Sequence, residues 1–167
     1  MRTLLKKIDV SLTFFENSLI VIILGAMVLL AFLQVLLRNV FETGILWGDI
    51  FLRHLVLWVG FLGASLATRE EKHISIDILT RVIAKKFVPL VKLLVDAVAI
   101  IVSVWLAKAG YVFLKFEIEA NTILFKNIPA WYFQLIIPVG FGLIGLRFLL
   151  KFIEQILDNP FKYFKTN

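Results

Sequence analysis

The stretch that decides the fold is residues 17–37, NSLIVIILGAMVLLAFLQVLL, in which no side chain is charged. A helix needs about 20 mostly apolar residues to cross the roughly 30 Å of hydrocarbon in a bilayer. This segment meets that requirement. Residues 127–147 meet it as well, because their single charge, Arg147, stands at the very end. The two segments therefore predict two membrane-spanning helices.

Two further segments, 45–68 and 87–107, are long and apolar enough to span despite internal charges. In the second of them the acidic and basic residues stand four apart, so they can pair along one helix face. We therefore predict an all-α integral membrane protein with four spans in a single domain, residues 1–167. The charged residues inside the two segments are Asp49, Arg53, Lys92 and Asp96.

The composition excludes several classes of protein. Sixty per cent of the residues are hydrophobic and 18 % are charged. Soluble domains have about 45–50 % apolar residues and about 25 % charged residues. The absence of cysteine excludes disulfides, thiolate metal sites and cysteine nucleophiles. The net charge of +6 comes without a basic cluster interleaved with aromatic residues, so we expect membrane lipids and no nucleic acid as a partner.

The distribution of basic residues predicts the orientation. Thirteen of the 18 lie in the first 16 residues, in the connection after the second span with the start of the third, or in the tail from Arg147 onwards. Because basic residues accumulate on the cytoplasmic side, both termini are predicted to be cytoplasmic. Trp47, Trp131 and Tyr132 then begin spans at the outer face, where amphipathic rings prefer to lie. We expect a multi-pass protein of the cytoplasmic membrane.

The second span carries a narrow stripe of polar and small residues. At about 100° per residue, Asp49, Gly60, Ala64 and Ala67 fall within about 40° of Arg53, as does the bulkier Leu57. The small-xxx-small pair of Gly60 and Ala64 favours close helix association. We interpret the stripe as a partner-subunit interface, which leaves the opposite, bulky face free to meet lipid; for Trp58 on that face, burial against other helices and lipid exposure both remain open. The interface residues are Trp47, Asp49, Arg53, Gly60, Ala64 and Ala67. The bulky residues are Phe51, Leu55, Trp58, Leu62 and Leu66.

Arg53 needs a partner, because a charge inside the membrane is costly. Asp49 stands one turn earlier and is the obvious candidate. Three interpretations remain open for this pair. It either satisfies itself near the outer interface, anchors another membrane protein, or takes part directly in moving a solute or ion.

The connection after the second span is basic and amphipathic. Apolar and basic residues alternate at helical spacing over 75–86, which predicts an interfacial helix on the inner membrane surface. Just before it, Arg69, His73 and Asp77 recur every four residues and can pair along one face if one helix contains them. Ser75 or Asp77 could instead cap a new helix. We expect these three residues to form a cytoplasmic membrane-surface motif.

The combination of these residues resembles a known family: the small membrane subunit, DctQ type, of tripartite ATP-independent periplasmic (TRAP) transporters. The match covers residues 47–77 and 128–147. In the first region the matching residues are Trp47-x-Asp49, Arg53, Trp58, Phe61-Leu62-Gly63-Ala64, Arg69, His73-Ile74 and Asp77. In the second they are Ile128-Pro129, Trp131, Pro138-x-Gly140-Phe141 and Arg147.

The resemblance implies a role in transport. In such systems a periplasmic solute-binding protein captures an organic acid, of the sialic acid or C4-dicarboxylate class, and passes it to a large membrane subunit that couples uptake to sodium. The small subunit is expected to act as a scaffold for the large one in the bacterial inner membrane. The resemblance implies neither an enzymatic activity nor a cofactor, and it leaves the solute and the stoichiometry open.

The first and fourth spans agree with a scaffold, because neither has a charged residue in its interior. A solute site usually needs broken helices and convergent polar groups near the midplane. We expect Pro138, Gly140 and Arg147 to serve a kink and close packing in the fourth span. Two alternatives to the scaffold are an autonomous four-helix exporter and a membrane-anchor subunit of a respiratory complex. With only His54 and His73 in the chain, no histidine pair can face a haem or metal. Glu117 and Glu119 are expected in an outer loop.

Overall fold

The computed structural model describes residues 2–70, 87–125 and 127–157. Within these ranges four helical stretches are long and apolar enough to cross a membrane, so the four predicted spans are confirmed. The helices are α1 (Arg2–Val40), α2 (Gly48–Glu70), α4 (Val88–Ala120), α5 (Trp131–Gln134) and α6 (Ile136–Leu157), the last two following one another in the fourth span. Two short strands, β1 (Ile123–Phe125) and β2 (Ile128–Pro129), precede α5.

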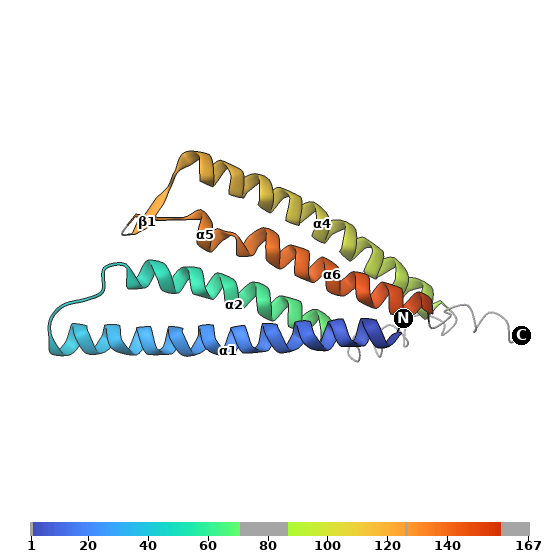
Figure 1. Cartoon of the computed structure of the whole chain (residues 1–167), viewed down its shortest axis with the longest axis horizontal. Coiled ribbons are helices and arrows are strands. Elements are labelled where there is room, and N and C mark those ends of the chain that lie inside the picture. The colour runs from blue at the N-terminus through green and yellow to red at the C-terminus, as the bar shows by residue number, and fades with distance from the viewer. Residues whose placement is uncertain (1, 71–86, 126, 158–167) are drawn as a thin grey trace, which may run out of the picture.

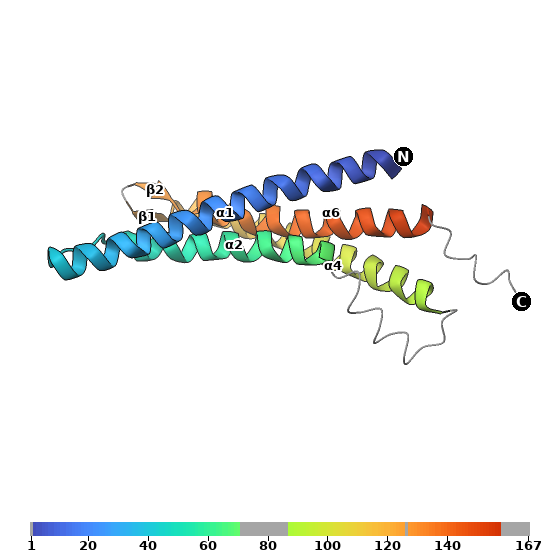
Figure 2. The same ribbon diagram turned by 90° about the horizontal axis from the view of Figure 1, so that it is seen from below.

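The helices form a layer in the order α1, α2, α6, α4 (Figure 1). The start of α1 and the end of α6 lie at the same end of this layer, which we call the terminal end. The opposite end, called the hairpin end, contains the α1–α2 connection and the two strands. Figure 2 shows that α1 crosses α2 obliquely, and side-chain contacts described below join its first half to α6. This crossing brings three helices together near the terminal end.

Several helices extend beyond the predicted spans. The first begins at Arg2 rather than at residue 17, and α4 ends at Ala120 rather than at residue 107. The 39 residues of α1 correspond to about 58 Å, well beyond the hydrocarbon thickness. Hydropathy marks only the part of a helix that lipid requires to be apolar. The prediction that Glu117 and Glu119 lie in a loop is wrong for this reason, because both belong to the last turn of α4.

A β-hairpin that the sequence reading did not predict closes the hairpin end. Its strands pair antiparallel, with Ile123 opposite Pro129. Two asparagines allow the chain to turn: Asn121 ends α4 with a φ of 50°, and Asn127 lies between the strands with a φ of 66°. Asparagine enters this left-handed region more readily than most residues. The hairpin leads the chain from α4 into the start of the fourth span.

The fourth span is interrupted at Leu135, between α5 and α6. Pro138 explains the position, because a proline ring clashes with the carbonyl group four residues earlier and offers no N–H to it. That carbonyl belongs to Gln134, the last residue of α5. The helical path nevertheless continues, since Val139 N–H donates to Leu135 O at 3.3 Å.

The predicted interfacial helix, residues 75–86, lies outside the described residues. The same is true of His73 and Asp77, two of the three residues of the predicted membrane-surface motif. The third, Arg69, is described: its Nε donates to Asp9 Oδ2 of α1 at 2.9 Å. The prediction for the connection therefore remains a prediction, and the described contact of Arg69 is with α1.

Candidate functional site

One face of α2 is left open by the rest of the chain. Arg53, Gly60, Ala64 and Ala67 are exposed in the described structure, as is Asp49 at the start of the helix. A Cβ atom added at Gly60 would meet nothing within 4 Å. We call this face, with the half-buried Trp47 beside it, the α2 stripe. No described element of this chain covers its part from Arg53 to Ala67 where Arg53, Gly60, Ala64 and Ala67 are exposed.

The bulky face of α2 points into the bundle and not towards lipid, which the sequence had left open to it. Leu62 is 2 % exposed, and Trp58 Nε1 donates to Phe133 O of α5 at 2.9 Å. The Phe51 and Phe133 rings also meet edge to face, with centroids 5.6 Å apart. Large side chains fill the space between α2 and the fourth span. Hydropathy could not distinguish the two faces, because lipid tails are as apolar as leucine.

At the hairpin end, Asp49 binds a residue of α1 rather than Arg53. Gln34 Nε2 donates to Asp49 Oδ1 at 3.0 Å. Gly48 makes this approach possible, since a Cβ atom there would lie 3.2 Å from Gln34 Cδ. In residues 2–70, 87–125 and 127–157 no ion pair joins Asp49 to Arg53, so the predicted pair is not formed. Arg53 is left exposed, with no hydrogen bond or ion pair to the described residues.

Near the terminal end, Arg147 of α6 stands at the centre of a buried polar network. Its Nε donates to Ser65 Oγ of α2 at 2.9 Å, and its Nη1 donates to Asp9 Oδ1 of α1 at 3.0 Å. Its Nη2 binds Glu16 Oε2 and lies 3.3 Å from Thr13 Oγ1. Ser65 Oγ in turn donates to Glu16 Oε1 at 2.7 Å. Three helices are thus joined through one guanidinium group.

The network balances its own charge. Asp9 and Glu16 supply two carboxylates, while Arg147 and Arg69 supply two guanidinium groups. Arg147 is 2 % exposed and Glu16 is 1 % exposed, whereas Arg69 and Asp9 at the edge remain partly exposed. Buried charges are tolerated when they are paired and hydrogen-bonded. This arrangement needs no second chain to complete it.

The sequence reading selected Arg147 and Arg69 but missed Asp9, Thr13, Glu16 and Ser65. The signal for the first three was their spacing of four and three residues, which places them on one face of a helix. That spacing carries meaning only if the helix begins well before the apolar segment, as it does at Arg2. Ser65 carried no signal, because its neighbours come from distant parts of the chain.

The other fourth-span residues take part in close packing. A Cβ atom at Gly140 would lie 2.7 Å from Phe61 Cβ of α2, and the rings of Phe61 and Phe141 meet edge to face at 5.0 Å. On the other side of α6, Gln155 Nε2 donates to Asp96 Oδ2 of α4 at 2.7 Å. The sequence places Asp96 where it can pair with Lys92 on its own helix, and the bond to Gln155 reaches across to α6.

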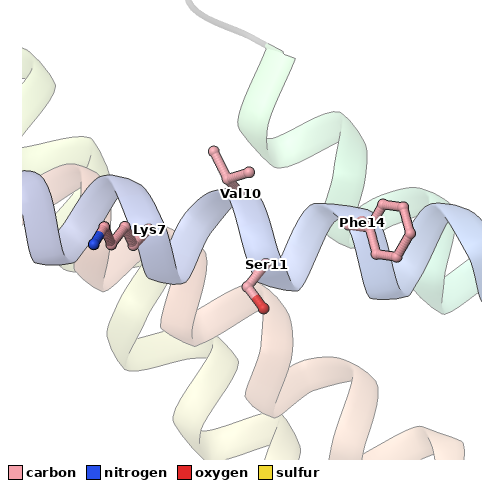
Figure 3. A pocket seen from close by; sticks show the side chains of 4 residues that line it. All are labelled: Lys7, Val10, Ser11 and Phe14. Atoms are coloured by element: carbon pink, nitrogen blue, oxygen red, sulfur yellow. The ribbon is translucent and has the colours of Figure 1, made fainter.

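The remaining candidates indicate no catalytic or metal site. Among the described residues no group of three His, Cys, Asp or Glu side chains could hold a metal ion. His54 Nδ1 lies 2.7 Å from Ile50 O of its own helix, and its ring packs on Phe133. An open groove follows α1 along Lys7, Val10, Ser11 and Phe14 (Figure 3). These four side chains come from one helix and offer no convergent set of polar groups.

Comparison with known proteins identifies the family. The model of the DctQ component of tripartite ATP-independent periplasmic transporters matches residues 27–158. A candidate TRAP transporter small permease protein of Haemophilus influenzae is 30 % identical over 115 residues, covering 66 % of this chain and 70 % of that protein. The C4-dicarboxylate TRAP transporter small permease protein DctQ of Pseudomonas aeruginosa is 26 % identical over 175 residues, covering 86 % and 83 % respectively.

A third relative is a longer protein. The sialic acid TRAP transporter permease protein SiaT of Haemophilus influenzae is 38 % identical over 53 residues, which cover 32 % of this chain and 9 % of that protein. Small permease subunits of this family partner with a large membrane subunit. The family match and the four apolar helices indicate a multi-pass protein of the bacterial inner membrane, a transport component rather than an enzyme. The chain therefore belongs to the DctQ family and is a small permease subunit of a TRAP transporter.

Proposed function

We propose that this subunit is a stationary scaffold that docks on the large membrane subunit through the α2 stripe. The transporter it serves takes up an organic acid that a periplasmic binding protein delivers, with sodium as the coupling ion. The observation that carries the proposal is the open face of α2, on which Arg53 and the small residues from Gly60 to Ala67 have no cover within the described chain. Small residues allow another helix backbone to approach closely.

The polar groups inside the bundle support a scaffold rather than an independent transporter. The network of Arg147 and the bond between Gln155 and Asp96 use polar groups to join helices of this chain to one another. A solute site would need such groups to converge on an open cavity near the midplane. In this subunit they hold helices in fixed positions, which is what a stationary component requires.

The orientation follows from the charges. With basic residues concentrated at both chain ends and in the connection after α2, the terminal end is proposed to face the cytoplasm. The hairpin end then faces the periplasm, where the binding protein delivers the solute. The C4-dicarboxylate and sialic acid names of two relatives set the solute classes to test first.

Reconstitution tests the scaffold. The subunit, its large partner or both are placed in liposomes with the binding protein, a sodium gradient, and labelled succinate or N-acetylneuraminate. We expect uptake of one of these acids only when both membrane subunits are present and the gradient is intact. Uptake by this subunit alone would contradict the proposal.

A packing variant tests the docking face. Gly60→Leu should lower the amount of large subunit that co-purifies, because the added side chain blocks helix approach. Gly25→Leu on α1 is the matched control, since a Cβ atom there also meets nothing within 4 Å. We expect Gly25→Leu to leave the complex unchanged. Normal recovery of the complex with Gly60→Leu would show that the α2 stripe is not the docking face.

A further inference from the structure

We propose that Arg53 forms an ion pair with a carboxylate of the large subunit, near the periplasmic end of α2. The inference rests on the proposed function and names the chemistry of the partner at one point of the α2 stripe. Arg53 lies five residues after Gly48, about 7–8 Å along the helix axis from its start. Its charge therefore belongs to the outer part of the span.

The first step is that Arg53 has no partner in its own described chain. It is exposed and makes no hydrogen bond or ion pair with the described residues. Asp49, the carboxylate at the spacing that favours pairing, is held instead by Gln34 of α1. A guanidinium group in a spanning segment is costly unless it is paired. Its counter-charge is therefore expected from outside the chain.

The second step concerns the surroundings of Arg53. The next residues along the same face are Val56, which is 56 % exposed, the half-buried Leu57, and Gly60, which presents no side chain. A helix of a partner can approach the backbone of α2 here and bring a short acidic side chain within reach. A lipid phosphate would also attract a guanidinium group. The small residues Gly60, Ala64 and Ala67, which begin two turns after Arg53 and lie deeper in the span, favour a helix over a headgroup.

The third step is a comparison within the molecule. Arg147 is an arginine that lies, like Arg53, well inside a described spanning helix, and it binds two carboxylates, those of Asp9 and Glu16. A planar guanidinium group matches a carboxylate with two parallel hydrogen bonds. The same chemistry at Arg53 would fix the register and rotation of α2 against the large subunit.

Charge reversal followed by charge exchange tests the ion pair. Arg53→Glu should reduce the co-purified large subunit at least tenfold, whereas Arg53→Lys should retain most of it. Arg38→Glu is the matched control, because Arg38 is an exposed arginine at the same end of the bundle. Each acidic residue in the periplasmic half of the large subunit is then changed to arginine and combined with Arg53→Glu. One such exchange should restore both the complex and uptake.

The outcomes separate the inference from the proposed function. If Arg53→Glu, folded as judged by its thermal unfolding in detergent, binds the large subunit normally, the ion pair does not exist. The same conclusion follows if no exchange restores the complex, or if a photo-crosslinking amino acid at position 53 reacts only with lipid. In these cases the wild-type complex still co-purifies and the scaffold stands. Failure of the wild-type chains to co-purify would overturn both proposals.

Discussion

Arg147 and Arg53 are both arginines in spanning helices, but this chain surrounds them differently. Arg147 is buried and meets two carboxylates and two hydroxyl groups from α1 and α2. Arg53 is exposed at the other end of the bundle, and the nearest acidic residue on its helix is bound to Gln34. The difference separates a charge that holds the subunit together from a charge that is available to another subunit.

The two regions also differ in what surrounds the charges. The network of Arg147 joins three helices, so its residues become neighbours only when α1 crosses to α6 near the terminal end. The residues that follow Arg53 on the α2 stripe are small and uncovered. A charge that is buried without a partner is expensive. A charge exposed on one subunit becomes buried on assembly, and a second subunit that supplies the opposite charge offsets that cost.

The largest expected effect comes from removing the centre of the network. Arg147→Met leaves Glu16 buried beside Asp9 without its cation, and loss of one member of a buried pair costs about 3–5 kcal/mol. The free energy of unfolding in detergent, measured by chemical denaturation, should fall by about that amount.

The double variant Glu16→Gln, Arg147→Met is the control for this change. It removes the uncompensated charge as well as its partner, so part of the lost stability should return. If the double variant is no more stable than Arg147→Met, the effect comes from packing around the arginine stem, and the charge balance described here is not its cause.

A smaller effect is expected from disturbing the packing of α6 against α2. Gly140→Leu forces a side chain into the space occupied by Phe61, so α2 and α6 must separate. Such overpacking typically costs about 1–3 kcal/mol, and the unfolding transition should shift accordingly. Gly142→Leu is the matched control on the same helix, since a Cβ atom there meets nothing within 4 Å. Equal losses in the two variants would contradict the close approach at Gly140.

The four spans could be predicted because the bilayer imposes a minimum run of apolar residues on every crossing helix. Their ends could not, because a helix continues through headgroups and water wherever its own residues permit. This is why Glu16 looked like a boundary of the first span, although it is a buried residue in the middle of α1's contacts with α6 and α2.

The functional residues also differ in how well the sequence could predict them. Arg53 and the small residues of the α2 stripe share one helix face, so their grouping follows from the helical repeat alone. The partners of Arg147 are 82 to 138 residues distant along the chain, and no periodic pattern encodes such contacts. Which face of α2 turns inward was equally hidden, because both lipid and a neighbouring helix accept bulky apolar side chains.

The smallest expected effect comes from breaking the bond between Gln34 and Asp49 at the hairpin end, next to Arg53. Gln34→Leu removes an exposed hydrogen bond, so the free energy of unfolding should fall by less than about 1 kcal/mol. The freed carboxylate of Asp49 can then pair with Arg53 one turn later and compete with the large subunit. Recovery of the complex should therefore drop, by less than the tenfold loss expected for Arg53→Glu.

The double variant Gln34→Leu, Asp49→Asn separates the two causes of such a drop. It removes the competing carboxylate while keeping the shape of the side chain, so the complex should return towards the wild-type amount. An unchanged complex in Gln34→Leu would show that Asp49 does not compete for Arg53. A double variant that stays as low as Gln34→Leu would show that Gln34 acts through its packing on Gly48, because the charge at position 49 would then make no difference to assembly.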